Sequence, residues 1–232
     1  MQLTVGIDAP LRMGGNDTSE AHGRVILVAA NHDHWFESEG WAAVLWMEPA
    51  SRVGRLFADG YLKSHPMSTL PEAALGGLWA RLRQMTANPV QLASALEVRK
   101  ALESAWFGDE VDTPPLHPAM RRAVAYIRGL DVLRVSADDV ARQVGVSKSH
   151  LLHLFSDQLG IPLRRYVLWL RHRRAIEGIV NGASATDAAH AAGFHDSAHL
   201  TRSFQTLAAI TPSDLLELRK HGHFAISDDD FE

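Results

Sequence analysis

The sequence contains no cysteine among its 232 residues. Disulfide bonds, thiolate metal sites and thiol nucleophiles are therefore excluded as features of this chain. Its apolar runs stay well short of the ~18 residues that a membrane-spanning helix needs. The N-terminus, MQLTVGIDAP, lacks the basic start and the long apolar stretch of a signal peptide. We therefore expect a protein of the cytoplasm that has no contact with a membrane.

Motifs of common enzyme sites are also missing. The sequence has no Gly-rich phosphate-binding loop, no nucleophile elbow of the GxSxG type and no HExxH zinc motif. It therefore predicts neither an enzyme nor a protein with a cofactor.

Acidic residues outnumber basic ones, giving a net charge of −4, but the two signs are unevenly distributed. Residues 1–117 hold 9 Lys and Arg against 14 Asp and Glu, whereas residues 118–224 hold 14 against 9. The tail, 225–232, adds four acidic residues and is read as a solvated end. A basic segment behind an acidic one is expected when one domain meets the phosphates of nucleic acid.

Apolar, β-branched runs predict strands in the first part of the chain, at 3–7, 24–30 and 41–47. The polar, Gly-rich segment 14–23 between the first two predicts a loop. The sequence therefore begins as a β domain.

Helical spacing of apolar residues follows over 71–85 and 89–107. Three prolines between residues 114 and 118 indicate a linker at 108–118. This composition predicts two domains, at 1–107 and 119–224.

The second domain contains an internal repeat. The segments DVARQVGVSKSHLLHLF (139–155) and DAAHAAGFHDSAHLTRSF (187–204) both run from Asp through small residues to Gly, a polar cluster, Leu and Phe. Their glycines lie 48 residues apart. A structural unit used twice is the simplest interpretation.

Each copy has the pattern of a helix-turn-helix. In the first, Ser136 is placed to cap a helix with Asp139, Gly145 allows a sharp turn, and Ser147 begins a second helix. Apolar residues at spacing three and four give that second helix an inner face. Its polar outer face suits a major groove about 12 Å wide.

The second copy repeats this arrangement, with Ser184 and Asp187 at the cap, Gly193 at the turn, and Asp196 or Ser197 at the start of the second helix. Arg202 faces outward and matches the edge of a guanine. Between the copies, residues 163–180 have an apolar stripe and five arginines, which predicts a helix. Such a helix is ~27 Å long, so it could hold two reading helices near one DNA turn apart.

Residues from about 119 to 218 resemble the AraC/XylS family of transcription regulators, through GVSKSHLLHLF, the GIP turn, the Arg-rich middle helix and AAGFHDSAHLTRSFQ…ITPSD. The resemblance implies an all-α domain with two helix-turn-helix units. Family relatives that repair DNA do so through a reactive cysteine, which this chain lacks. The base contacts that the resemblance implies are Ser149, Leu152, His153, Ser197, Ala198, Thr201 and Arg202. We expect backbone contacts from Ser147, Lys148, Arg164, Arg165, Arg171, Arg173 and Arg174.

The first domain resembles, more weakly, the cupin-type sensor barrel of the same family. LTVGIDAPLR looks like an interior strand of such a barrel, so we expect its first strands to be missing. The resemblance places His32, His34, Trp35 and Trp46 as candidates for a small-molecule pocket. The two-domain α+β class, a partial cupin-like barrel with helices before an all-α double helix-turn-helix, follows from both resemblances.

Plainer interpretations stand beside these. One helix-turn-helix pattern could be ordinary helical packing, but two in register with a basic connecting helix favour DNA binding. The arginines at 171–174 could form a solvated face. His32 and His34 could ligate a metal, but no third ligand is evident, so we expect a loop or pocket role and no metal.

The sequence thus predicts a DNA-binding transcription regulator that a small molecule controls and that acts on double-stranded promoter DNA. RNA polymerase is a further partner that the sequence neither indicates nor excludes. The alternative is a DNA-binding protein whose first domain only dimerises. In either case the apolar stripe of 71–107 predicts a homodimer.

Overall fold

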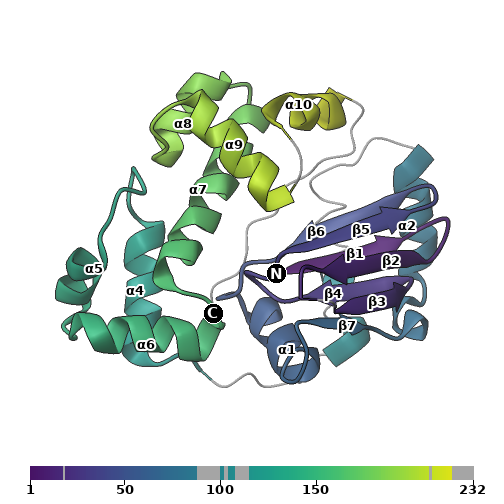
Figure 1. The fold of residues 1–232 in the computed structure, drawn as a ribbon, viewed down its shortest axis with the longest axis horizontal. Coiled ribbons are helices and arrows are strands. Elements are labelled where there is room, and N and C mark those ends of the chain that lie inside the picture. Colours follow the sequence, from purple (N-terminus) through teal and green to yellow (C-terminus); the bar gives the residue numbers. More distant parts are fainter. Residues whose placement is uncertain (18, 88–99, 102–103, 108–114, 209–210, 221–232) are drawn as a thin grey trace. The chain divides into compact units, whose positions relative to one another are not determined.

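The computed structural model describes residues 1–17, 19–87, 100–101, 104–107, 115–208 and 211–220 (Figure 1). The chain forms two compact units, one up to Pro114 and one that begins at Pro115. The first holds all the described strands, and the second holds helices alone. The predicted α+β class, with β structure first and helices second, is confirmed.

The first unit contains two antiparallel sheets. One has the order β6-β1-β4-β7 and the other β3-β2-β5. Their strands are β1 Gln2–Gly6, β2 Leu11–Gly15, β3 Glu20–Gly23, β4 Val25–Val28, β5 His34–Ser38, β6 Ala42–Trp46 and β7 Met67–Thr69. The predicted strands at 3–7, 24–30 and 41–47 are therefore confirmed as β1, β4 and β6.

The predicted loop at 14–23 is wrong in part. It includes the end of β2 and the whole of β3, which pair as a hairpin with Gly14 opposite Glu20. These strands are short and carry Gly, His and Glu, so they lack the apolar run that marks a buried strand.

Two apolar clusters hold the first unit together. The smaller joins the facing sides of the two sheets through Leu11 and Met13 of β2 and Ile26 and Val28 of β4. The larger covers the other side of the first sheet with helices α1 (Arg52–Tyr61) and α2 (Leu78–Ala87). A short 3-10 turn, η1 (Glu72–Leu75), precedes α2, so the predicted helix at 71–85 is confirmed only in its second part.

Helix α1 was not predicted, because Gly54 and Gly60 lower its intrinsic propensity. Its packing explains it. Phe57 is buried against the sheet, and Ser51 caps the first turn by accepting a hydrogen bond from the Gly54 amide at 3.1 Å. A Cβ on Gly54 would lie 2.2 Å from the Glu48 carbonyl oxygen, so only glycine allows the first turn of α1 to lie this close to the preceding backbone.

The predicted helix at 89–107 and the predicted linker at 108–118 lie largely outside the described residues. Within the part that is described, Trp106 and Phe107 pack on the larger cluster, where both rings meet Phe57 edge to face. The end of this segment therefore belongs to the core of the first unit.

The second unit consists of seven described helices. One of them, α7 (Leu163–Val180), lies at the centre of the other six (Figure 1). The others are α4 Pro118–Arg128, α5 Ala137–Val144, α6 Lys148–Leu159, α8 Ala185–Ala192, α9 Ser197–Ala208 and α10 Pro212–Lys220. The first half of α7 packs with α6 through Tyr166 and Phe155, and its second half packs with α8 and α9 through Ala175 and Ile179. Helix α7 thus packs against both helix-turn-helix repeats.

Candidate nucleic-acid interface

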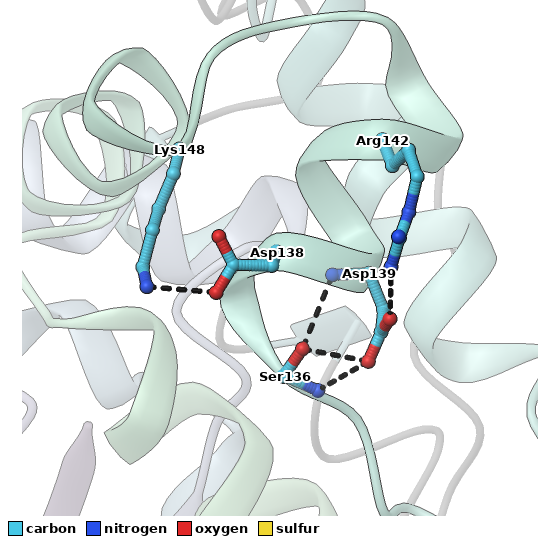
Figure 2. Close-up of polar contacts among 5 residues, drawn as sticks. All are labelled: Ser136, Asp138, Asp139, Arg142 and Lys148. Atoms are coloured by element: carbon cyan, nitrogen blue, oxygen red, sulfur yellow. Dashed lines mark hydrogen bonds and ion pairs between the residues drawn. The ribbon is translucent and has the colours of Figure 1, made fainter.

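The first helix of the first repeat begins with a capping box (Figure 2). The Ser136 hydroxyl accepts a hydrogen bond from the Asp139 amide at 3.2 Å, and the Asp139 carboxylate accepts one from the Ser136 amide at 3.3 Å. The Ser136 hydroxyl also donates to the Asp139 carboxylate at 2.6 Å, and this bond, the one from the Ser136 amide and the nearby Arg142 hold the pKa of Asp139 below its ordinary value. The predicted cap is confirmed.

The turn and the second helix also follow the prediction. Gly145 ends α5 with φ of 71°, a left-handed conformation that favours glycine. Ser147 then caps α6 by accepting a hydrogen bond from the His150 amide at 3.2 Å. Lys148 forms an ion pair with Asp138 at 2.7 Å across the two helices (Figure 2).

Helix α6 has a clear inner and outer face. Leu151, Leu154, Phe155 and Leu159 are buried. Ser149, Leu152 and His153 are exposed, with Leu152 at 38%. The three side chains predicted to read bases in this helix therefore share its solvent side, while their contact with bases stays a prediction.

The second repeat is built in the same way. Ser184 caps α8 by accepting a hydrogen bond from the Asp187 amide at 3.1 Å, and Gly193 turns the chain with φ of 89°. Asp196 caps α9, since its carboxylate accepts a hydrogen bond from the His199 amide at 2.6 Å. That bond, followed by those from His195, lowers the pKa of Asp196.

The outer face of α9 is more mixed than that of α6. Ala198 and Arg202 are exposed, whereas Ser197 and Thr201 are half-buried. The Thr201 hydroxyl donates to the Ser197 carbonyl at 2.9 Å, so its proton is used inside the helix. Arg202 is the charged group that this face offers.

The five arginines of α7 predicted to contact the DNA backbone divide into two groups. Arg164 and Arg165 are exposed in the first turn. Arg173 is only 13% exposed and its Nε donates to Glu177 at 2.9 Å. The prediction treated all five alike, because spacing alone does not show which arginines have partners.

Arg171 and Arg174 bind the segment that joins α4 to α5. Arg171 Nε donates to the Leu133 carbonyl at 2.7 Å, and Arg174 donates to the carbonyls of Arg128, Leu130 and Asp131. Burial lowers the pKa of Arg171. These guanidinium groups have partners inside the unit, which gives them a structural role that the sequence did not predict.

His172 is a buried polar side chain that the sequence analysis did not single out. The structure places it in the core of the second repeat. Its Nε2 lies 2.8 Å from the Ser203 hydroxyl of α9. The helical spacing of 172, 175 and 179, three positions on one buried stripe, is the signal that could have identified it.

The four residues proposed for a ligand pocket in the first unit do not share one surface. Trp35 lies opposite Gly14, on the outer side of the second sheet, where Arg12 stacks over its ring. Trp46 shares the inner face of the first sheet with Ala42, and its Nε1 donates to Gln2 at 3.0 Å. The grouping of these two tryptophans in one pocket is wrong.

The two histidines occupy the loop before β5 and its first position. His32 Nε2 lies 3.3 Å from the Ser19 hydroxyl, and the His34 ring contacts the His32 carbonyl at 2.9 Å. Burial lowers the pKa of His34. Among the described residues, no group of three or more His, Asp or Glu side chains could hold a metal ion.

Phe36 is the inner-face aromatic that sequence reasoning missed. It lies opposite Met13 of the core between the sheets, yet it is 40% exposed. Trp46 is 37% exposed on the facing sheet. Both belong to strands at sheet edges.

In the described part of the chain, no helix has the length and apolarity to cross a membrane.

Comparison with known proteins agrees with the geometry of the second unit. Residues 140–217 match the helix-turn-helix domain family. No curated protein matches the chain. A transcriptional regulator from Chromobacterium violaceum, described by its AraC-type DNA-binding domain, is 30% identical over 44% of this chain and 92% of its own, with a TM-score of 0.42.

The whole chain is similar in fold to ToxT from Vibrio cholerae. The alignment covers 94% of this chain and 88% of ToxT, at 10% identity and a TM-score of 0.60. A ToxT structure with an unsaturated fatty acid bound aligns over 97% and 89%, at 12% identity and a TM-score of 0.57. The chain belongs to the AraC/XylS family of transcription regulators and carries an AraC-type helix-turn-helix domain at residues 140–217.

Proposed function

We propose that this regulator reads two adjacent segments of the major groove, one with α6 and one with α9. The observation that carries this proposal is the pair of capped helix-turn-helix units on the single helix α7. With 18 residues, α7 is ~27 Å long. That length suits two reading helices near one DNA turn, ~34 Å, apart.

Base readout is assigned to the outer faces of both helices. Arg202 of α9 has the planar fork that matches guanine O6 and N7, and His153 of α6 offers one ring nitrogen for a base edge. Leu152 suits the methyl group of thymine. The full set is Ser149, Leu152, His153, Ser197, Ala198, Thr201 and Arg202.

Backbone contact is assigned first to the exposed donors near α6. Ser147, Lys148, Arg164 and Arg165 all lie on the surface. Arg171, Arg173 and Arg174 are weaker candidates, because each donates within the unit. Contacts of this kind make affinity fall steeply with salt.

Selection of DNA from a random pool by the full chain tests this function. We expect enriched sites with two conserved segments about one helical turn apart. Binding that is equally tight to every sequence would contradict the proposal.

A second function is suggested by two partly exposed aromatic side chains on the facing sides of the two sheets of the first unit. Phe36 and Trp46 are 40% and 37% exposed there, and ToxT has been solved with an unsaturated fatty acid bound. We propose that a small, largely apolar effector binds against these two rings. A saturable rise in the melting temperature of the protein with long-chain fatty acids would support a sensor. If none of a set of apolar compounds changes the melting temperature, a first domain that only dimerises explains the protein better.

We also propose a homodimer, because two copies would engage two operator sites. The described part of the predicted stripe does not add to this argument, because Leu78 and Leu82 of α2 are buried in the core of the first unit. Light scattering that shows a monomer at high micromolar concentration contradicts it.

A further inference from the structure

The inner side of α9 packs on an apolar core to which α8 contributes only small side chains, Ala188, Ala189 and Ala192. Leu200 and Phe204 of α9 meet larger buried side chains from other elements there, including Ile179, Phe194 and Leu215. Apolar contacts of this kind are not directional, so they constrain the rotation of α9 about its axis less specifically than a hydrogen bond does.

His172 enters this core from α7. It is 2% exposed, its ring is stacked on Phe204 with centroids 5.2 Å apart, and it lies 5.4 Å from the ring of Phe194. Its Nε2 is 2.8 Å from the hydroxyl of Ser203. A polar bond therefore joins the central helix to the reading helix inside an otherwise apolar cluster.

This bond is directional, unlike the contacts around it. Ser203 follows Arg202 directly, and a shift of α9 by one residue would turn it by ~100° and break the bond. Desolvation on burial lowers the pKa of His172 to about 4, so the ring is neutral near pH 7 and the bond joins two neutral groups. Breaking it would leave a buried polar group without a partner, which is costly.

We propose that His172 is a positioning residue for DNA reading: its hydrogen bond to Ser203 fixes the rotation at which α9 presents Thr201 and Arg202 to the bases. The inference rests on the proposed reading role of α9. It assigns specificity to a residue that is buried and touches no DNA.

Three substitutions in the full chain test the inference. Ser203→Ala removes the bond with little change in volume, Ser203→Thr keeps the hydroxyl, and His172→Leu replaces the ring with an apolar side chain. Ser156→Ala, at an exposed position of α6, is the matched control. Each variant is measured on the selected operator and on its single-base variants, together with its melting temperature.

We expect Ser203→Ala and His172→Leu to relax discrimination under α9 by about three- to tenfold, the equivalent of one hydrogen bond. Discrimination under α6 stays unchanged, and Ser203→Thr and Ser156→Ala behave as the parent protein. The double variant, His172→Leu with Ser203→Ala, loses no more than either single variant. His172→Leu keeps or raises the melting temperature, which a purely structural role would not combine with lost specificity.

Unchanged discrimination in both single variants overturns the inference, and so does an equal loss under α6 and α9. Arg202→Ala separates this failure from failure of the proposed function, because it tests reading by α9 directly. If Arg202→Ala leaves base preference intact, amide hydrogen exchange of the free protein shows whether the His172–Ser203 bond holds α9 in place. Faster exchange at 201–204 alone in Ser203→Ala supports the positioning role, and unchanged exchange overturns it.

Discussion

The two helix-turn-helix units of this chain have the same caps and turns but different cores. The first reading helix, α6, is fixed by four large buried side chains, and the ring of Phe155 packs against Tyr166 of α7. The second, α9, packs Leu200 and Phe204 on a core to which α8 contributes only alanines, and one buried histidine bond joins it to α7. The two units therefore share an apolar core but differ in the size of the side chains facing the reading helix and in the directional polar contact that the second unit adds.

The largest effect that this difference predicts is on stability. Phe155→Ala should lower the free energy of unfolding by about 3–5 kcal/mol, because it removes a fully buried ring from the core of large side chains. Ala189→Gly in the second unit should cost about 1 kcal/mol, since it deletes one methyl from a helix. Urea unfolding of both variants measures these costs, and a cost below about 1 kcal/mol for Phe155→Ala would contradict this account of the first core.

The pH dependence of stability should come partly from the second unit. The pKa of His172 falls from 6.5 to about 4 on folding, so the unfolded chain takes up the proton first. The free energy of unfolding should therefore decrease as pH falls from about 6.5 toward 4, by roughly 3 kcal/mol for this group.

His172→Leu is the control for this effect. Its stability should depend less on pH in the same window, as measured by urea unfolding at several pH values. Identical pH profiles for the two proteins would show that His172 titrates normally.

Base discrimination should also divide between the units. Arg202→Ala should cost about 1–3 kcal/mol on the best operator and relax the preference at one base pair. Leu152→Ala in α6 should cost less, because it removes an apolar contact and no hydrogen bond. A uniform loss of affinity in Arg202→Ala, with preference unchanged, would show that Arg202 grips phosphate instead.

The arginines of α7 provide a comparison within one helix. Arg164→Ala should weaken binding about equally on all sequences and lower the slope of log affinity against log salt by about one. Arg174→Ala should affect stability instead, because it removes donors from the carbonyls of Arg128 and Leu130. Binding at several salt concentrations, with urea unfolding, separates the two, and a normal salt slope for Arg164→Ala would remove it from the interface.

The smallest expected effect concerns the ion pair in Figure 2. Asp138→Asn frees Lys148 from its partner and removes a negative charge near the reading helix, so affinity for all DNA should rise about twofold. Gln143→Glu, at an exposed site on the same helix, is a control that adds charge. Lower affinity in Asp138→Asn would mean that the pair orients Lys148 productively.

The sequence predicted the second unit better than the first because its signals are local. Caps at Ser136 and Ser184 and turns at Gly145 and Gly193 each depend on a few neighbouring residues. The strands β2, β3 and β5 have polar or Gly-containing sequences with no long apolar run, and the pairing of β2 with β5 joins residues that are not neighbours along the chain.

The candidate site was also predicted well where the signal is local and poorly where it depends on tertiary contacts. Helical spacing placed Ser149, Leu152 and His153 correctly on one solvent-facing side. It did not show that Arg171 and Arg174 bind carbonyls some 40 residues earlier in the chain, nor that Trp35 and Trp46 point to different faces, because both facts are tertiary.

Reading of two groove segments by one chain is the central claim, and protection of DNA on the selected operator tests it most directly. The full chain should protect two major-groove segments about one helical turn apart. Arg202→Ala should weaken protection of one segment, and Ser149→Ala with His153→Ala that of the other. A single protected segment, weakened equally by both changes, would contradict the account.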